Sequence, residues 1–319
     1  FEQQALPLKT LGDALHIRNR ILVRLEQAEL EDDPEKRRTL TTFIVVGGGS
    51  SGVEVAGATA DLLQAARRYY PRTEPLDTRV ILLEGSDRLV PELPGPLGEA
   101  ALKSMRRHGV EVHLNTRAGK VTHLGVKAQS GEWIRGGNVI CTVGTAPNPL
   151  LQTLDVPRQK GLIRARPDMS VPGVQGVWAI GDCAALVNAR DGELSPPTAQ
   201  FAVRQGRQVA ENIARVVRGQ STRPFSYRSR GALASIGHRR AIGHVRGVKL
   251  SGFAAWLLWR ALYLSILPTF LRKLQVFSEW NLELLFPRDI TQLHLERTPT
   301  RRAVSDDRRQ PESGFRHTA

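Results

Sequence analysis

Residues Thr41–Arg68 read TTFIVVGGGSSGVEVAGATADLLQAARR and combine a short apolar strand, a glycine turn and a helix. The strand, Phe43–Val46, leads into Gly47-x-Gly49-x-x-Gly52, after which the spacing of apolar residues becomes helical. Such a turn presents free backbone N–H groups and the positive end of a helix dipole to an anion. Gly47 permits the turn, Gly49 lets the backbone approach phosphates, and Gly52 lets the helix pack on the strand. We therefore predict a site for a dinucleotide pyrophosphate.

A second strand follows this helix, at Arg79–Glu84, and ends in an acidic residue. Glu84 stands where a carboxylate can accept hydrogen bonds from both hydroxyls of an adenosine ribose. Its distance from the glycine turn is longer than usual because Pro71–Thr78 is inserted between helix and strand. A carboxylate here would repel a ribose 2′-phosphate, so we expect NADH to be preferred over NADPH, although Arg88 lies close in sequence. The order of strand, turn, helix and strand favours a nucleotide site over an ordinary glycine turn.

The composition is that of a globular protein with an excess of positive charge. Of 319 residues, 41% are hydrophobic and 24% are charged, and the net charge is +14. We expect no nucleic-acid partner, because the basic residues do not alternate with aromatic ones as they do on a base-stacking surface. Many of them lie near the apolar segment after residue 246 and in the tail, which favours an anionic membrane surface.

The cysteines and histidines indicate neither a redox dithiol nor a metal centre. Cys141 and Cys183 are far apart and form no CxxC motif, as in proteins of a reducing compartment. His238 and His244 lie six residues apart among basic residues, without a carboxylate or cysteine to complete a metal site. We therefore predict no metal ligands.

Hydrophobic spacing predicts alternating helices and strands up to about residue 147 and a second unit after residue 150. The first unit is predicted to hold a helix through Leu11–Leu25, a helix at Leu97–Arg107, a strand at Val110–Leu114, a hairpin within Val121–Ile134 and a strand at Asn138–Val143. In the second unit we expect strands at Leu162–Arg166 and Gly176–Ile180 and a helix from Thr198 to Val217. The second unit lacks a βαβ opening, so it reads as the C-terminal half of a domain.

The segment Phe253–Phe270 is almost wholly apolar but contains Arg260 and Pro268 and has basic residues on both sides. A spanning helix needs about 20 clean apolar residues. We therefore predict a helix that lies in a membrane interface, with its cations reaching the headgroups, rather than one that spans. The alternative is a helix buried in the protein core.

Several segments together resemble the type II, non-proton-pumping NADH:quinone oxidoreductases, which are FAD-dependent pyridine-nucleotide oxidoreductases. They are PLKTL at 7–11 with Arg18-Asn19, VVGGGSSGVEVAG at 45–57, GVWAIGDCA at 176–184, PPTAQFAVRQG at 196–206 and LASIGH at 233–238. The resemblance implies FAD and NAD(H) as cofactors and electron transfer from NADH through flavin to a membrane quinone. It also implies a peripheral position on the cytoplasmic side of the inner (cytoplasmic) membrane, and a homodimer as a candidate assembly.

With this resemblance, the expected fold is α/β: a Rossmann-like NAD-binding domain inserted in an incomplete FAD-binding domain, followed by an amphipathic, membrane-associated helical region. The expected parts are a remnant of the FAD domain with a connecting helix at 1–40, the NAD(H) domain at 41–147, the C-terminal half of the FAD domain at 148–222, the membrane-anchoring region at 223–290 and a disordered tail at 291–319. The family's N-terminal FAD-binding glycine motif has no counterpart in the sequence. We therefore expect an N-terminally truncated fragment that is inactive alone.

The resemblance also assigns roles to single residues. Asp182, which follows Gly181 at a strand end, matches the aspartate that holds a ribityl hydroxyl of the flavin, and Gly144 also ends a strand beside the cofactors. Glu54 matches a glutamate of the flavin–nicotinamide region that handles protons or positions cofactors.

The quinone site of the family contains an AQ-x-A-x-Q pattern. Gln200 matches the first glutamine, but Arg204 occupies the position of the second, with Gln205 beside it. Positions 200 and 204 share a helix face, so a cation would replace an amide at the quinone pocket.

Two other functions fit parts of the sequence. One is a soluble NAD(P)H–flavin reductase that passes electrons to a protein such as a ferredoxin, for which the apolar segment Phe253–Phe270 has no use. The other is a non-catalytic, membrane-bound NAD-binding protein, which is favoured if the gene lacks the FAD half.

Overall fold

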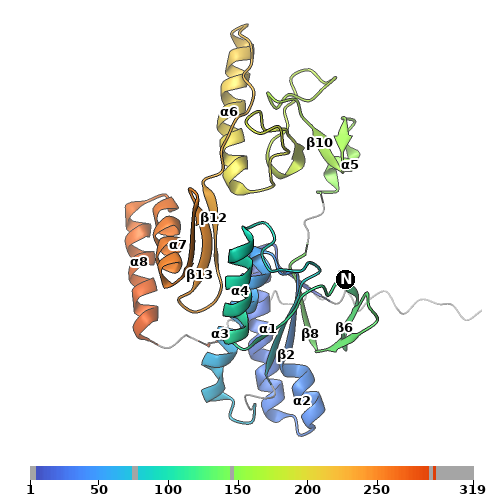
Figure 1. The fold of residues 1–319 in the computed structure, drawn as a ribbon, viewed down its shortest axis with the longest axis vertical. Helices are drawn as coiled ribbons and strands as arrows, with labels where there is room; N and C mark the ends of the chain where they lie inside the picture. The colour runs from blue at the N-terminus through green and yellow to red at the C-terminus, as the bar shows by residue number, and fades with distance from the viewer. Residues whose placement is uncertain (1–4, 74–77, 144–146, 287–289, 292–319) are drawn as a thin grey trace, which may run out of the picture.

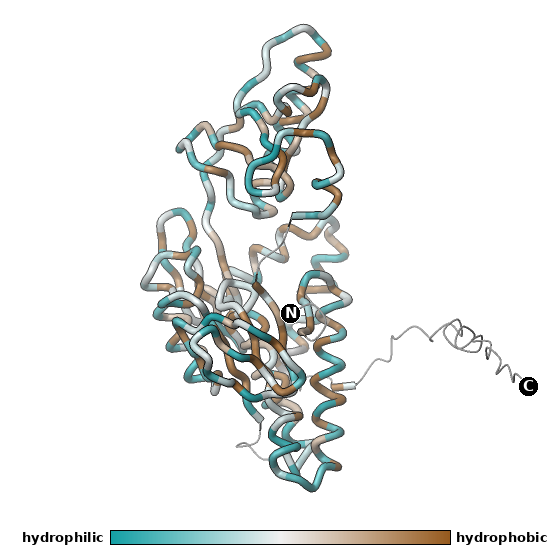
Figure 2. Tube along the Cα trace, turned by 90° about the vertical axis from the view of Figure 1, so that its right-hand side faces the viewer, coloured by the Kyte–Doolittle hydropathy of each residue, from teal (hydrophilic) through white to brown (hydrophobic). Residues whose placement is uncertain are grey.

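A computed structural model describes residues 5–73, 78–143, 147–286 and 290–291. Its centre is a sheet of five parallel strands in the order β1-β8-β2-β3-β4, which is the arrangement of a Rossmann-like domain. The strands are β1 (Leu6–Pro7), β2 (Thr42–Val46), β3 (Arg79–Leu83), β4 (Val110–His113) and β8 (Asn138–Cys141). Both faces of this sheet are covered, which explains why its strands are apolar along most of their length (Figure 2).

Three helices cover one face of the parallel sheet, and a small antiparallel sheet covers the other (Figure 1). The helices are α1 (Leu11–Leu30), α3 (Ser50–Ala66) and α4 (Gly95–Arg107), and the small sheet consists of β5 (Ala118–Thr122), β6 (Gly125–Ala128) and β7 (Trp133–Arg135). The predicted hairpin is therefore a three-stranded sheet. It buries Val121, Val126 and Ile134 against Ile44 and Ile81 of the parallel strands.

The segment from Leu6 to Leu30 packs against the same sheet. β1 pairs in parallel with β8, and Ile17, Ile21 and Leu25 of α1 are buried in the core beneath the sheet. The helix begins at a capping box in which the Thr10 hydroxyl accepts from Asp13 N while Asp13 accepts from Thr10 N. It ends before Pro34, which starts the additional helix α2 (Pro34–Thr41).

A second unit stands above the first in Figure 1 and has a core of its own. It contains α5 (Leu150–Thr153), β9 (Arg158–Gln159), β10 (Leu162–Arg164), the 3₁₀ turn η2 (Gly181–Cys183), β11 (Ala184–Ala185) and α6 (Ala199–Val217). The strand predicted at Gly176–Ile180 is wrong, because only Trp178 there forms a bridge, with Ser170. The predicted helix Thr198–Val217 is confirmed, with Thr198 as its N-cap residue.

The C-terminal unit is an antiparallel sheet covered by a helical hairpin, seen at the left of Figure 1. Its elements are β12 (Gly231–Ser235), β13 (Ala241–Val245), β14 (Val248–Gly252), α7 (Phe253–Ile266) and α8 (Phe270–Leu285). The prediction of one helix through Phe253–Phe270 is wrong in extent. The apolar run is broken at Leu267–Pro268, and Thr269 then caps a second helix by accepting from Arg272 N.

This C-terminal unit is docked on α3 of the NAD domain through backbone. A Cβ atom on Gly57 would lie 2.9 Å from the Gly237 nitrogen, a distance that real Cβ atoms do not show. Ala234 and Ile236 from β12 and the following loop, with Ile242 of β13, enter the core that α1, α3 and α4 share. The glycine at position 57 therefore lets the two units meet closely.

Candidate functional site

The glycine turn after β2 has the geometry expected of a Rossmann-like turn. Gly47 has φ +108°, which favours glycine, and its N–H donates to Leu83 O at 2.8 Å. Any Cβ on Gly52 would overlap the carbonyl oxygen of Gly47, so the first turn of α3 rests directly on the loop. Gly47 and Gly52 are thus required by the path of the backbone.

The N-terminus of α3 faces a carboxylate of the same chain. Gly49 is the N-cap residue, and it has no side chain to satisfy the first N–H groups of the helix. Glu92 takes that place: its Oε1 accepts from Ser50 N at 2.8 Å and from Ser50 Oγ at 2.5 Å. The same Oε1 lies 3.8 Å from where a Gly49 Cβ would be. The position predicted for phosphate therefore accepts an anionic group.

Glu84 follows β3 at the carboxyl edge of the sheet, as predicted, and lies beside the glycine turn. Its Oε2 accepts from Gly48 N at 2.6 Å, and its Oε1 accepts from Ser86 N at 2.7 Å and from Ser86 Oγ at 2.8 Å. These bonds fix the carboxylate next to the turn. Oε2, which accepts only from Gly48 N, has a further lone pair, so the group can still accept from a ribose hydroxyl.

Glu54 lies one turn into α3, where the C-terminal unit covers it. Its Oε1 accepts from Ser235 N of β12 at 3.0 Å. Burial raises the pKa of the Glu54 carboxyl, against the opposing effect of this hydrogen bond. The pKa of the Tyr263 hydroxyl, on α7, is also raised, first by partial burial and then by the negative charge of Glu54.

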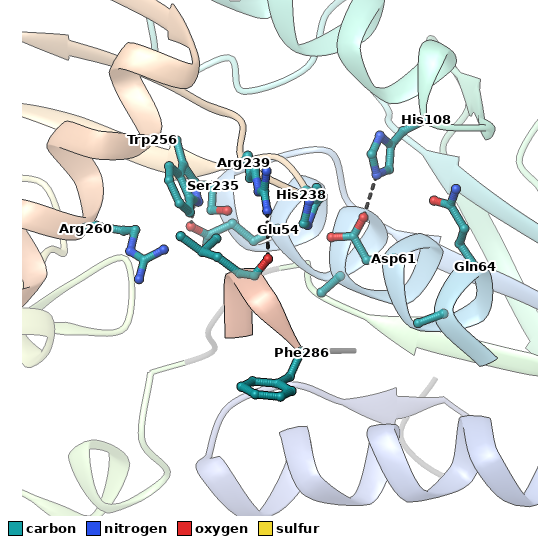
Figure 3. A pocket seen from close by; sticks show the side chains of 14 residues that line it. Glu54, Asp61, Gln64, His108, Ser235, His238, Arg239, Trp256, Arg260 and Phe286 are labelled. Carbon is teal, nitrogen blue, oxygen red and sulfur yellow. Dashed lines mark hydrogen bonds and ion pairs between the residues drawn. The ribbon is translucent and has the colours of Figure 1, made fainter. Parts of the chain in front are cut away.

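A cavity of about 700 Å³ opens between α3 and the C-terminal unit beside Glu54 (Figure 3). Asp61, two turns further along α3, contacts His108 Nε2 at 2.5 Å across its floor. On the other side, the Arg260 guanidinium lies 4.6 Å from the Trp256 ring and 4.8 Å from the Trp280 ring. Arg260, in the middle of the apolar segment, thus contacts two indole rings.

The turn that holds Asp182 lies in the second unit. Gly181 has φ +66°, and its N–H donates at 2.7 Å to Oε1 of Gln205, a side chain that is 1% exposed. Asp182 is exposed, and within the part of the chain that the structure describes its carboxylate forms no hydrogen bond or ion pair. The turn is rigid and presents a carboxylate with free lone pairs, which fits a hydroxyl donor such as the ribityl chain of a flavin.

Gln200 and Arg204, predicted to face a quinone, are both engaged with the protein. The Gln200 amide donates to Gly231 O at 3.0 Å and accepts from Tyr227 Oη at 2.6 Å and from Arg230 N at 2.8 Å. The Arg204 guanidinium donates to Gln200 O at 2.9 Å and lies 4.5 Å from the Tyr227 ring. The two side chains share a face of α6, as their spacing predicted, and meet on Tyr227.

The structure brings Gly47, Gly49, Gly52 and Glu84 together around one end of the parallel sheet, with Glu54 further along α3. The residues Gly181, Asp182, Gln200 and Arg204 lie together in the second unit. Gly144 is outside the described residues. In the described part of the chain, no group of three or more His, Cys, Asp or Glu residues could hold a metal ion.

Two features of the site had no clear signal in the sequence. Glu92 lies in a loop whose path decides what it meets, and the pair Asp61–His108 joins two helices. Gln205 could have been singled out, because an amide at a helix position that faces the Gly181 turn is buried only when it is bonded.

Two protein-family models match this chain. The family model of the pyridine nucleotide-disulphide oxidoreductases matches residues 4–206, and the model of the NDH2 C-terminal domain matches residues 229–289. The type II NADH:quinone oxidoreductase Ndh of Mycobacterium tuberculosis is 32% identical over 304 residues, which cover 90% of this chain and 64% of that protein. The internal alternative NAD(P)H-ubiquinone oxidoreductase A1 of Solanum tuberosum is 28% identical and is covered to 62%. The chain therefore spans a little under two thirds of these relatives.

Solved structures show the same fold. The NDH2 structure from Plasmodium falciparum, determined in complex with NADH, matches with a TM-score of 0.84 at 18% identity, over 91% of this chain and 75% of that one. A ferredoxin reductase from Rhodopseudomonas palustris matches with a TM-score of 0.57 at 19% identity, over 76% of this chain and 52% of that one. The expected α/β fold with a Rossmann-like domain is thus confirmed. The chain belongs to the pyridine nucleotide-disulphide oxidoreductase family and, within it, to the type II NADH dehydrogenases.

Proposed function

We propose that the protein is an NADH:quinone oxidoreductase that uses FAD and does not pump protons. The observation that carries this proposal is the docking of the C-terminal unit on α3, the helix that begins at the predicted pyrophosphate position. Glu54 of α3 accepts a hydrogen bond from Ser235 of that unit, and the two units share a hydrophobic core. The predicted dinucleotide site is thus joined directly to the unit that carries the apolar helical hairpin.

In this proposal, the first turn of α3 binds the pyrophosphate of NADH, and Glu84 binds the adenosine ribose. Asp182, held by Gly181 and Gln205, binds the ribityl chain of FAD. A bound flavin supplies the two-electron chemistry that links a hydride donor to a quinone. Glu54, with its raised pKa, holds or releases a proton near the reacting groups.

The quinone is proposed to approach Gln200 and Arg204 of α6. The Arg204 guanidinium donates to Gln200 O and lies over the Tyr227 ring. These contacts hold its positive charge in a fixed position on α6. A cation at this place favours an oxygen that gains negative charge, which is what a quinone carbonyl does on reduction.

The C-terminal hairpin is proposed to bind the membrane surface from the cytoplasmic side. In the described residues no helix is long and apolar enough to cross a bilayer. The hairpin nevertheless exposes many large apolar side chains: Phe253, Leu257, Leu258, Leu262, Tyr263, Ile266, Phe270, Leu271, Leu274, Phe277, Leu282 and Phe286. Exposed apolar side chains in such number mark a membrane or a protein interface. A ferredoxin-type reductase would have no use for it, so the hairpin favours a quinone as acceptor.

The test is NADH oxidation by the full-length protein in vesicles that contain a long-chain quinone, followed together with quinone reduction. We expect the two rates to be equal and flavin to copurify with the protein. Reduction of a soluble protein acceptor without quinone reduction would overturn the proposal in favour of the ferredoxin-type alternative. Sedimentation of the detergent-solubilised protein decides whether the apolar hairpin is instead covered in a homodimer.

A further inference from the structure

A second cavity lies at one end of the C-terminal sheet, and its lining is basic. It encloses about 470 Å³ between the segment Arg228–Gly231, His244, and the turn Arg246–Gly247. Arg246 N donates to Arg230 O at 3.2 Å, so the two segments that carry the arginines are joined by backbone. The backbone at this end of the sheet therefore fixes the positions of the residues that line the cavity.

The arginines around this cavity have no ionic partner in the part of the chain that the structure describes. Among the described residues, no carboxylate lines it, and the guanidinium groups of Arg228, Arg230 and Arg246 form no hydrogen bond or ion pair. Lys249, which pairs with His244 across β13 and β14, adds a further cation beside it. Gathering like charges costs free energy unless an anion joins them. Guanidinium groups have the planar donor geometry that matches phosphate oxygens in pairs.

The cavity lies at the same end of the C-terminal unit as the turn of the helical hairpin. β12 begins at Gly231, opposite Val245, so the cavity lies at the end of the sheet that carries the turn Arg246–Gly247. α7 starts after Gly252, at the opposite end, and its 14 residues run back for about 21 Å, which is enough to pass the five-residue strands of about 17 Å. The turn between α7 and α8 therefore lies at the same end as the cavity, as Figure 1 also shows.

That turn is the most exposed apolar part of the hairpin. Ile266 is 68% exposed, and Phe270 and Leu271 are each 77% exposed. An apolar tip beside an unpaired basic cavity is the arrangement that a phospholipid surface satisfies, with acyl chains at the tip and the phosphate among the cations.

We propose that Arg228, Arg230, His244 and Arg246 form a binding site for the headgroup phosphate of an anionic phospholipid. The site rests on the membrane contact proposed above and deepens it, because it selects lipids by headgroup. A general layer of positive charge would respond to charge alone. A built site also responds to the donor geometry of the arginines.

The test is flotation of the full-length protein with vesicles of phosphatidylcholine, with and without phosphatidylglycerol. Replacing Arg228 and Arg246 by Gln should lower binding to the anionic vesicles roughly five-fold for each cation removed, about 25-fold in all. Binding to pure phosphatidylcholine should not change. The matched control is Lys120→Gln with Arg135→Gln, which removes the same charge from the small antiparallel sheet and should leave both values unchanged.

A third variant separates a site from a charge layer. Replacing Arg228 and Arg246 by Lys keeps the charge and removes the paired donors, so we expect about a five-fold loss of anionic binding. Binding equal to that of the wild type would overturn the proposal.

One further result is decisive. If inorganic phosphate binds the wild type but not the Gln variant in calorimetry, while both bind vesicles equally, the ligand is soluble and the lipid site is wrong. Flotation needs no turnover, so a failure of quinone reduction would be seen separately. Thermal unfolding of each variant shows whether it is folded.

Discussion

The Glu92 carboxylate accepts from both the backbone N–H and the hydroxyl of Ser50 at the first turn of α3. These are groups that a pyrophosphate would use in the proposed nucleotide site. Glu92 therefore competes with the dinucleotide for the same donors, and its negative charge must leave when phosphate binds.

Removing this competing charge should tighten nucleotide binding. We expect Glu92→Gln to lower the dissociation constant of NADH about two- to five-fold, because a charge near a helix N-terminus is worth roughly 0.3–1 kcal/mol. Fluorescence titration with NADH and with ADP-ribose measures it, and both ligands should respond alike. Weaker binding in the variant would show that Glu92 supports the site instead of competing for it.

Glu84 should decide the choice between NADH and NADPH. Its bonds to Gly48 and Ser86 hold the carboxylate where a ribose 2′-phosphate would meet it. Glu84→Gln should reduce the preference for NADH, measured as the ratio of kcat/KM for the two cofactors. The exchange also replaces an acceptor by an NH₂ group, so we expect a loss of about 1 kcal/mol in stability. An unchanged ratio, or a wild type that prefers NADPH, would contradict the assignment.

The raised pKa of Glu54 predicts a particular pH dependence of stability. Burial makes the folded protein hold the Glu54 proton to higher pH than the unfolded chain does. As the pH rises above the ordinary glutamate pKa of 4.5, Glu54 therefore ionises first in the unfolded chain. The free energy of unfolding then falls until the pH passes the folded pKa. Glu54→Gln cannot ionise, so its stability relative to the wild type should rise from acid to neutral pH.

Glu111 provides a control of opposite sign for that experiment. Burial opposes its ionisation, but hydrogen bonds from Arg79 and His113 outweigh burial and lower its pKa. Its contribution is present at neutral pH and is lost as pH falls through the folded pKa. Glu111→Gln should therefore be less stable than the wild type at neutral pH and equal to it in acid. If the Tm of each variant ran parallel to that of the wild type across the pH range, neither pKa shift would exist.

Gln205 should matter for both stability and flavin retention. Gln205→Leu leaves the Gly181 N–H without its acceptor, which costs about 1–3 kcal/mol, and it loosens the turn that presents Asp182. Thermal unfolding and the flavin absorbance of the purified full-length protein measure the two effects.

Gln208, one turn away on α6, is the matched control for Gln205. Its Nε2 is buried without a hydrogen-bond partner in the described structure, so Gln208→Leu should be neutral or stabilising. Equal losses in the two variants would mean that any glutamine on this helix matters only for packing.

The sequence was informative where local chemistry alone decides the structure. The apolar run Phe43–Val46 and the glycines after it specify a strand, a turn and a helix, and Glu84 follows from the next strand. The C-terminal unit was harder because Phe253–Phe270 reads as one apolar helix. In the structure the chain turns at Pro268, and Trp280 of the second helix packs on Trp259 and on the Arg260 guanidinium of the first. These contacts join residues about 20 positions apart, which the local pattern does not reveal. Contacts made by loops, such as Glu92 with Ser50, depend on the path of the chain in space.

The three hydrogen bonds of Gln200 have a consequence for how mutants of this helix are interpreted. Because the amide ties α6 to Tyr227 and to the start of β12, Gln200→Ala changes the connection between two units as well as any contact with a substrate. Lost turnover in that variant alone cannot be assigned to substrate binding. A double-mutant cycle with Tyr227→Phe separates the two effects, since a purely architectural role makes the two losses non-additive and leaves the KM for quinone unchanged.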